Sequence, residues 1–416
     1  MLDVEKVRAD FPILKSETRG IPLVYLDNAA TTQVPQEVTD RIVSHYAHDN
    51  ANVHRGMHHL AHRSTEALEE ARQTVARFVN APDVDGVVFT RGTTDSLNMV
   101  AQGLKHLLDP SSKVVTSVSE HHSNLLPWQQ VCQERGAELC VLPLDDNGDV
   151  DIEALEGELA AGNVSIVALT GCSNITGSVL PAETVAKACH DHGALFVLDG
   201  AQLMRHKRID IQAISCDYLA FSGHKMMAGT GVGVLVGPLA SMELITPRDF
   251  GGEMVVKATV DRGTWEKLPL RLEAGTPNYV GAIALGAACD YLAKIGRDEI
   301  ARYEDELLQQ AEDRLQAVEG LRIIGAPKER AGVVSFTIDG VHPLDLCCLL
   351  DTKGVALRSG HNCAQPLLNY LGLESVSRMS PAFYNTAEEI DFAVEQIKRA
   401  SDLLRARSRQ LCKLHN

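Results

Sequence analysis

A repeated alternation of short apolar runs with helix-like segments is the feature that most constrains the fold of this chain. From residue 86 to residue 236, each apolar run is followed by a longer segment of mixed polarity. Short, almost wholly apolar runs are typical of strands buried on both faces of a sheet. The pattern therefore predicts an α/β fold, with a mostly parallel sheet and helices on both faces. The expected strands are residues 87–90, 114–118, 138–142, 164–170, 194–198, 216–221 and 231–236.

Two of the expected strands end in residues that can do chemistry. Asp199-Gly200-Ala201-Gln202 follows the run at 194–198, and Ser222-Gly223-His224-Lys225 follows the run at 216–221. Open α/β sheets bind ligands at the carboxyl ends of their strands. A desolvated lysine can form a Schiff base, and an acid can keep a pyridine nitrogen protonated, which are the two needs of pyridoxal 5′-phosphate. By itself, the segment around Lys225 would also fit an ordinary solvated turn.

Together these segments resemble the class V aminotransferase superfamily of fold-type I pyridoxal phosphate enzymes. The closest resemblance is to the SUF-type (group II) cysteine desulfurases and the selenocysteine lyases. It runs from VRADFP near the N-terminus to YNTAEEID at residues 384–391. The resemblance implies a large cofactor-binding domain at residues 27–287 and a smaller α+β domain at residues 288–416. The N-terminal residues 1–26 are expected to join the smaller domain.

The resemblance assigns most polar strand ends to the cofactor. Thr93 and Thr94 open a helix after the strand at 87–90 and would bind the phosphate, which the helix dipole favours, although an ordinary N-cap has the same residues. His121 would stack on the cofactor ring and assist proton transfer. The expected cofactor residues are Thr93, Thr94, His121, Asn174, Asp199, Gln202, Ser222, His224, Lys225 and, from the second subunit of a homodimer, Thr276.

A second cluster of polar residues follows a short expected strand that ends near residue 357. Its sequence RSGHNCAQP, at residues 358–366, resembles the family segment RxGHHCAxP, in which the cysteine accepts sulfur. A thiolate is a strong nucleophile, and an arginine can bind both oxygens of a carboxylate. The resemblance therefore makes Cys363 the catalytic cysteine and assigns Arg358 and Arg378 to the substrate carboxylate, with Arg378 as the direct contact.

Three further positions refine this resemblance. His54, in the triplet His54-Arg55-Gly56, matches a family segment at the active-site entrance and is expected to contact the substrate. The chain departs from the family at Gly171 and at Asn362, where the family has histidines. We expect the first change to affect substrate details and the second to affect the reactivity of the neighbouring cysteine.

The predicted activity is that of a pyridoxal phosphate-dependent cysteine desulfurase. Lys225 would remove the α-proton of L-cysteine, and the thiolate of Cys363 would take the sulfur as a persulfide and leave L-alanine. A sulfur acceptor would then pass the sulfur to iron–sulfur clusters or other sulfur compounds. A selenocysteine lyase, another class V lyase or epimerase, and a non-catalytic scaffold for sulfur relay stay open as alternatives.

Composition argues against several other classes of protein. A formal net charge of −16 with no basic stripe argues against a nucleic-acid partner. Ten cysteines without CxxC pairs indicate reduced thiols and a cytoplasmic protein, and their spacing with the 16 histidines suggests no metal site. The N-terminus has no signal-peptide pattern, and no apolar stretch reaches the roughly 18 residues of a membrane helix. Residues 281–320 are expected to form one long helix, followed by C-terminal helices at 387–411.

Overall fold

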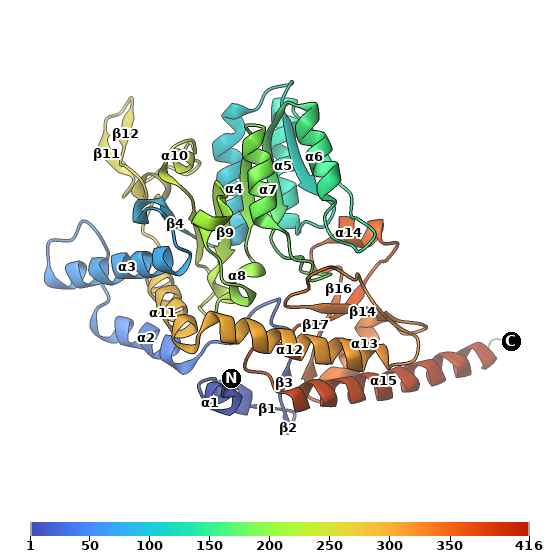
Figure 1. Cartoon of the computed structure of the whole chain (residues 1–416). Coiled ribbons are helices and arrows are strands. Elements are labelled where there is room, and N and C mark those ends of the chain that lie inside the picture. The colour runs from blue at the N-terminus through green and yellow to red at the C-terminus, as the bar shows by residue number, and fades with distance from the viewer. Residues whose placement is uncertain (1, 415–416) are drawn as a thin grey trace.

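A seven-stranded sheet forms the centre of the larger part of the protein, for which a computed structural model describes residues 2–414 (Figure 1). The strand order is β4-β10-β9-β8-β7-β5-β6. Strand β10 runs antiparallel to both of its neighbours, and every other neighbouring pair in this sheet is parallel. The predicted α/β fold with a mostly parallel sheet is thus confirmed. The strands are β4 (Val87–Thr90), β5 (Lys113–Ser117), β6 (Glu138–Leu142), β7 (Val164–Thr170), β8 (Leu195–Asp199), β9 (Tyr218–Ser222) and β10 (Gly233–Val236).

Helices cover both faces of this sheet, because successive side chains of each strand point to opposite sides. On one face, Val197 belongs to a core shared with helices α4 (Thr93–Leu104) and α5 (His122–Arg135), in which Trp128 is fully buried. On the other face, Leu198 belongs to a core that includes α3, α7 and α11. The helices on this side and at the rim are α2 (Gln36–His48), α3 (His59–Phe78), α6 (Ile152–Ala161), α7 (Ala182–Asp191), α8 (Leu203–His206), α9 (Ile211–Ile214), α10 (Leu239–Met242) and α11 (Tyr279–Ile295).

A second core surrounds a four-stranded antiparallel sheet of order β13-β14-β17-β16. The N-terminal segment takes part in it, since β3 (Val24–Tyr25) pairs with β15 (Val355–Ala356) and Leu26 is buried there. The division into residues 1–26, 27–287 and 288–416 stays our proposal, although Val7, Phe11 and Leu14 pack in the core of the large sheet and the 287/288 boundary falls within α11. The other elements of this unit are β13 (Leu321–Ile323), β14 (Val334–Ile338), β16 (Arg358–Gly360), β17 (Val376–Met379), α12 (Arg297–Gln316), α13 (Pro343–Asp351), α14 (Gln365–Tyr370) and α15 (Ala387–Leu414); helix α1 (Val4–Ala9) precedes them in the chain.

The prediction of one helix across residues 281–320 is wrong. Two helices, α11 and α12, meet at Gly296, whose φ of +103° is a backbone conformation that side chains disfavour. Helix α12 then starts with two acidic residues in its first turn, which the helix dipole favours. The prediction of several C-terminal helices at residues 387–411 is also wrong, because a single helix, α15, spans them.

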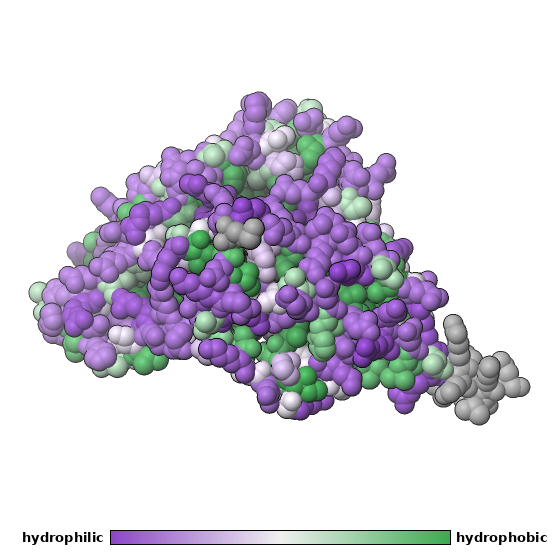
Figure 2. Space-filling view, turned by 60° about the horizontal axis from the view of Figure 1, so that its bottom comes forward, coloured by the Kyte–Doolittle hydropathy of each residue, from purple (hydrophilic) through white to green (hydrophobic). Residues whose placement is uncertain are grey.

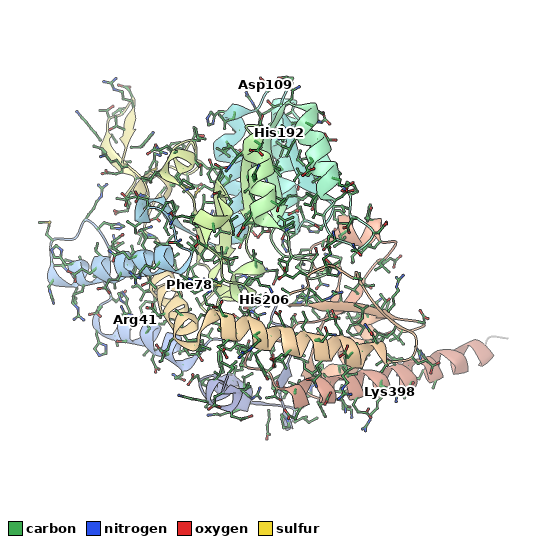
Figure 3. The ribbon with its side chains drawn as sticks, viewed as in Figure 1. Arg41, Phe78, Asp109, His192, His206 and Lys398 are labelled. Atoms are coloured by element: carbon green, nitrogen blue, oxygen red, sulfur yellow. The ribbon has the colours of Figure 1, made fainter. Side chains whose placement is uncertain are left out.

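A buried charged cluster ties the two cores together near this break. His206 of α8 lies against α12, where its Nδ1 is 2.6 Å from Oε2 of Glu304 (Figure 3). Arg205 contacts the same carboxylate, which also accepts the backbone N–H of Phe383 over 2.9 Å. Glu304 therefore connects the helix that follows the β8 turn to the chain that leaves β17.

The remaining surface is mainly polar. The face in Figure 2 is covered largely by hydrophilic residues, in keeping with the net charge of −16. Strands β11 (Val255–Ala258) and β12 (Gly263–Trp265) form a projecting hairpin (Figure 1). Within residues 2–414, no helix combines the length and the apolar character needed to cross a bilayer.

Candidate active site

A cavity of about 340 Å³ opens where the carboxyl ends of β7, β8 and β9 face the second sheet. Nearly all residues that the sequence assigned to cofactor and substrate line it, although they come from segments far apart in the chain. The predicted residues in its wall are Thr93, Thr94, His121, Asn174, Asp199, Gln202, Ser222, His224, Lys225, Arg358, Cys363 and Arg378.

Lys225 and Asp199 come from neighbouring strands of the large sheet. Asp199 is the last residue of β8, and Lys225 ends the tight turn that follows β9. Burial lowers the pKa of Lys225 to about 8, with the charge of Asp199 acting in the opposite direction. Burial also raises the pKa of Asp199, against a hydrogen bond of 2.9 Å from the N–H of Ala201. The pair thus offers an amine with a large neutral fraction near pH 8 and a buried acid.

A cradle for an anion lies at the start of helix α4. The backbone N–H of Thr93 donates to Oγ of Ser222 over 2.7 Å, and the Thr93 hydroxyl is within 2.7 Å of the same oxygen. The exposed Thr94 hydroxyl contacts Ser123 over 2.7 Å. Burial lowers the pKa of His224 to about 4. Hydroxyls and helix N–H groups gathered in this way suit a phosphate.

His121 supplies a flat, uncharged ring to the same cavity. It caps α5 by accepting the N–H of Ser123 at Nδ1 over 3.1 Å, which leaves the proton on Nε2. Burial lowers the pKa of His121 to about 3, and the charges of Lys225 and Arg378 act in the same direction. A neutral imidazole at neutral pH suits stacking on an aromatic ring better than donation of a proton.

Two arginines face each other across the second sheet, where Arg358 of β16 pairs in register with Arg378 of β17. Asp27 offsets their charges: its carboxylate lies 3.0 Å from Nη2 of Arg358 and 3.4 Å from Nη2 of Arg378. Arg378 is only 2% exposed, and its Nε has no hydrogen-bond partner among the described residues. Burial lowers its pKa to about 10. A buried guanidinium in the wall of this cavity is suited to a substrate carboxylate.

Asp27 is a site residue that the sequence reasoning missed. Its tie to both arginines depends on contacts across more than 300 residues of chain, so no local pattern around it indicates the role. The available signal was its position in a small-residue turn, Asp27-Asn28-Ala29-Ala30, directly after an apolar run.

Cys363 lies at an exposed position in the loop after β16 and reaches the cavity wall. The loop contacts the cofactor side of the cavity, since Nδ2 of Asn174 donates to the carbonyl oxygen of Asn362 over 2.7 Å. The carbonyl of Asn174 in turn accepts from Nη1 of Arg378 over 3.0 Å. Lysine, acid, cysteine and arginine therefore meet in one cavity.

Comparison with known proteins agrees with this geometry. The family model described as "Aminotransferase class-V" matches residues 24–392. The chain belongs to the class-V aminotransferase family.

Its relatives are similar over almost the whole chain. A "Probable cysteine desulfurase" of Halalkalibacterium halodurans is 43% identical over 402 residues, which cover 96% of this chain and 98% of the relative. A "Cysteine desulfurase" of Synechococcus elongatus is 44% identical over 95% of this chain and 63% of its own length. The solved structure of the cysteine desulfurase CsdA (S-sulfonic acid) from Escherichia coli has a TM-score of 0.89 at 38% identity and covers 97% of this chain and 99% of its own.

The cavity of this class-V family member fits pyridoxal 5′-phosphate. The fit rests on a lysine amine and a buried acid at adjacent strand ends, and on an anion cradle at a helix N-terminus. Within residues 2–414, no group of three or more His, Cys, Asp or Glu side chains is placed to hold a metal ion. The donor set is therefore that of an organic cofactor with a phosphate group.

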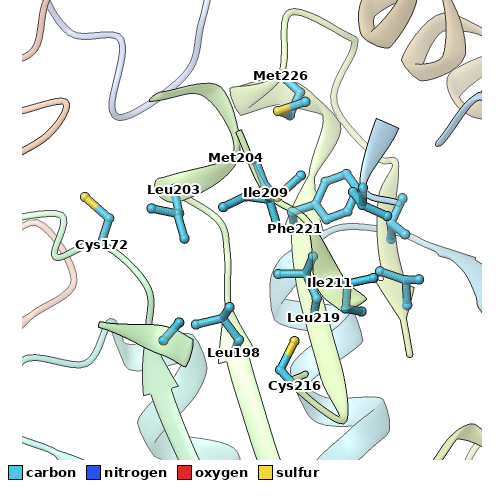
Figure 4. Close-up of a cluster of buried hydrophobic side chains, with 14 of the residues drawn as sticks. Cys172, Leu198, Leu203, Met204, Ile209, Ile211, Cys216, Leu219, Phe221 and Met226 are labelled. Carbon is cyan, nitrogen blue, oxygen red and sulfur yellow. The ribbon is translucent and has the colours of Figure 1, made fainter. Parts of the chain in front are cut away.

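The departure from the family at Gly171 lies beside the core under the cavity. A Cβ atom added at Gly171 would lie 2.8 Å from Leu203 and 3.1 Å from Leu198, both in the core under the site (Figure 4). The neighbouring Cys172 does line the cavity, but burial raises its pKa to about 12. The expectation that this change affects substrate details stays a prediction.

His54 and Thr276 lie outside the cavity of the single chain. His54 is 3.4 Å from Glu69, and this hydrogen bond raises its pKa. The same histidine borders a separate depression beside the β11–β12 hairpin, together with Trp265. Thr276 is exposed in the loop before α11. Their expected roles at the entrance and in a second subunit's site stay predictions.

Proposed function

We propose that this protein is a cysteine desulfurase, which converts L-cysteine to L-alanine and takes the sulfur onto Cys363 as a persulfide. One observation carries the proposal: Lys225 and Asp199 from the large sheet share a cavity with Cys363 and Arg378 from the second unit. The names of the relatives support it, because the likeness extends over nearly the whole chain.

Pyridoxal 5′-phosphate is the cofactor of the proposed enzyme. When bound, it supplies an electron sink for the electron pair released at the substrate α-carbon. Lys225 would hold it covalently, Asp199 would pair with its ring nitrogen, and His121 would stack on its ring. Asn174 and Gln202 would bind its ring oxygen, and Thr93, Thr94, Ser222 and His224 would bind its phosphate.

The chain's own residues then carry out the proton and sulfur transfers. Arg378, assisted by Arg358, binds the substrate carboxylate, and the neutral amine of Lys225 takes the α-proton. The thiolate of Cys363 attacks the substrate sulfur, so that an S–S bond forms as the C–S bond breaks. The carbon fragment regains protons and leaves as L-alanine, and Cys363 keeps the sulfur as a persulfide.

The turnover ends when the persulfide sulfur leaves. An acceptor protein or a thiol reductant takes the sulfur from Cys363, and its exposed position supports such access. We assign the sulfur to iron–sulfur clusters or other sulfur compounds. A cytoplasmic location is part of the same proposal, because a persulfide enzyme with free thiols suits a reducing compartment.

A homodimer is also part of the proposal. Large apolar side chains are exposed on α2, just before α3, at the start of α3 and on the β11–β12 hairpin, and this kind of surface is typical of an interface. These residues are Val43, Tyr46, Met57, Leu60, Val256, Val260 and Trp265. His54 and Thr276 belong to the same part of the chain, and we propose that they complete the partner's cavity. Sedimentation of the purified protein measures its oligomeric state.

The Cys363→Ala variant tests the function directly. It should keep the yellow colour of the bound cofactor but form no alanine or sulfide from L-cysteine, whereas Cys348→Ala, a change at another exposed cysteine, should leave activity intact. Full desulfuration by Cys363→Ala would refute the proposed nucleophile. Comparison of L-cysteine with L-selenocysteine in the same assay separates a desulfurase from a selenocysteine lyase.

A further inference from the structure

One histidine beside the site holds the cysteine loop and has no part in the proposed reaction. His122 is the first residue of α5. Its backbone N–H donates to the carbonyl oxygen of Cys363 over 2.8 Å, and its Nε2 accepts the backbone N–H of Gln365 over 3.2 Å. His122 therefore binds the loop at Cys363 and at Gln365, on both sides of Ala364.

These two hydrogen bonds matter because the backbone of the loop is strained. Asn362 has φ of +50° and Cys363 has φ of +57°, both in the left-handed region. Asparagine tolerates this region better than most residues, but cysteine does not share that tolerance. Two consecutive residues in this region persist only where neighbouring contacts hold them. The strain is therefore centred on the residue that carries the reactive sulfur.

A second histidine, His361, binds Cys363 from within the loop. Nδ1 of His361 accepts the backbone N–H of Cys363 over 3.1 Å, and its ring lies 5.8 Å from that of His122. The N–H and the C=O of Cys363 are thus both bound, one by each histidine. An imidazole nitrogen accepts a hydrogen bond only when it carries no proton.

The His122 ring stays neutral in these surroundings. Burial lowers its pKa, and the charge of His361 acts in the same direction. The other titratable group beside it is His121, whose pKa is about 3. Nε2 of His122 is therefore free to accept the Gln365 N–H at neutral pH.

We propose that His122 is the positioning residue for Cys363. It holds the loop in its strained conformation and so keeps the sulfur at the cavity, beside Lys225 and Arg378. Without the His122 side chain, the backbone N–H of Gln365 loses its acceptor. The backbone bond from His122 to Cys363 does not hold the strained loop alone, so the loop relaxes and carries the thiol away from these cations. The inference deepens the proposed sulfur transfer and rests on it, although the loop contacts themselves can be tested separately.

Selective alkylation tests the position of the thiol. Cofactor-loaded protein is treated briefly with iodoacetamide, and mass spectrometry gives the ratio of alkylated Cys363 to alkylated Cys348, an exposed cysteine on α13. Cations near a thiol favour the reactive anion, so His122→Ala should lower this ratio by about threefold or more. The amide oxygen of His122→Gln can accept the Gln365 N–H and should restore the ratio. Gln365→Ala keeps its backbone N–H and should match the wild type.

Steady-state kinetics provides a second readout. His122→Ala should lower kcat for alanine formation about tenfold, because small displacements of a reacting group are costly. KM for L-cysteine and the cofactor absorbance should stay the same, since neither Arg378 nor Lys225 is touched. His122→Gln should recover most of kcat.

Two results would overturn the proposal. One is a wild-type alkylation ratio together with wild-type kcat in His122→Ala. The other is an equal loss in the Ala and Gln variants with lowered thermal stability, which would indicate a structural role only. Failure of the wild-type protein to form alanine from L-cysteine would refute the proposed function instead, and the alkylation ratio would still decide the role of His122.

Discussion

The two arginines of the site should contribute very unequally to substrate binding. Arg378 is 2% exposed, whereas the side chain of Arg358 is 47% exposed where it pairs with Asp27. Both arginines line the cavity, so the buried charge of Arg378 is the less screened of the two. Replacement of each arginine by alanine therefore compares a buried carboxylate contact with an exposed one on the paired strand.

The expected changes in KM follow from how deeply each arginine side chain is buried. Truncating one partner of a buried, hydrogen-bonded charge pair costs about 2–5 kcal/mol, and an exposed pair is worth about 0–1 kcal/mol. At about 1.4 kcal/mol per factor of ten, Arg378→Ala should raise KM for L-cysteine by roughly 30-fold to 3,000-fold, and Arg358→Ala by about fivefold at most. Arg378→Lys should fall between the wild type and Arg378→Ala, because lysine keeps the charge but not the two-pronged geometry.

Initial rates of alanine formation over a range of L-cysteine concentrations give these values, with cofactor absorbance as the check on folding. Cysteamine is the matched substrate, because it has the amine and the thiol of cysteine but no carboxylate. It cannot form alanine, so released sulfide is measured for both substrates. The penalty of Arg378→Ala should disappear with cysteamine. A larger effect from Arg358→Ala than from Arg378→Ala, or an equal penalty with cysteamine, would show that Arg378 does not bind the carboxylate.

Two further predictions concern the lysine and the family departure. In protein freed of cofactor, the rate of pyridoxal 5′-phosphate uptake should rise with pH through about 8 and level off above it, because Lys225 loses its proton there; a rise that continues to the range of an ordinary lysine would contradict the lowered pKa. Gly171→His should destabilise the protein by about 1–3 kcal/mol, because the new side chain overpacks against Leu203 and Leu198. Differential scanning calorimetry should show a melting temperature lower by a few degrees, and alanine assays should show no gain in activity. Unchanged stability would show that position 171 opens into the cavity.

The sequence predicted the large sheet and its side of the site because both depend on local patterns. Each apolar run is a strand in the structure, and polar residues directly after a run lie at the carboxyl edge, where Asp199 and Lys225 meet. The helix break at Gly296 had a local signal as well, because two acidic residues follow the glycine closely. Residues that favour helices, such as Lys294 and Arg297, stand on both sides of it and continue the helical pattern. Local reading failed there because a glycine inside a helix and a glycine between helices look alike.

The contacts between the two cores could not be predicted in this way. His122 meets Cys363, and Asp27 meets Arg378, only after both units have folded and packed together. The adjacent pair His121-His122 gave no indication that one ring faces the cavity and that the other binds the loop of Cys363. The resemblance to a family identified the reacting groups, whereas the residues that position them required coordinates.

The division of the site between two cores explains why positioning residues are numerous. The lysine and the acid are fixed by strand pairing within one sheet, so their separation changes little. Cys363 and Arg378 belong to the other unit, and their place opposite Lys225 depends on a few ties: Asn174 to the cysteine loop, and His206 of α8 to Glu304 of α12. A small shift between the cores would move the sulfur acceptor away from the lysine without disturbing either sheet. Residues that make these ties therefore control the reaction although they take no part in bond making.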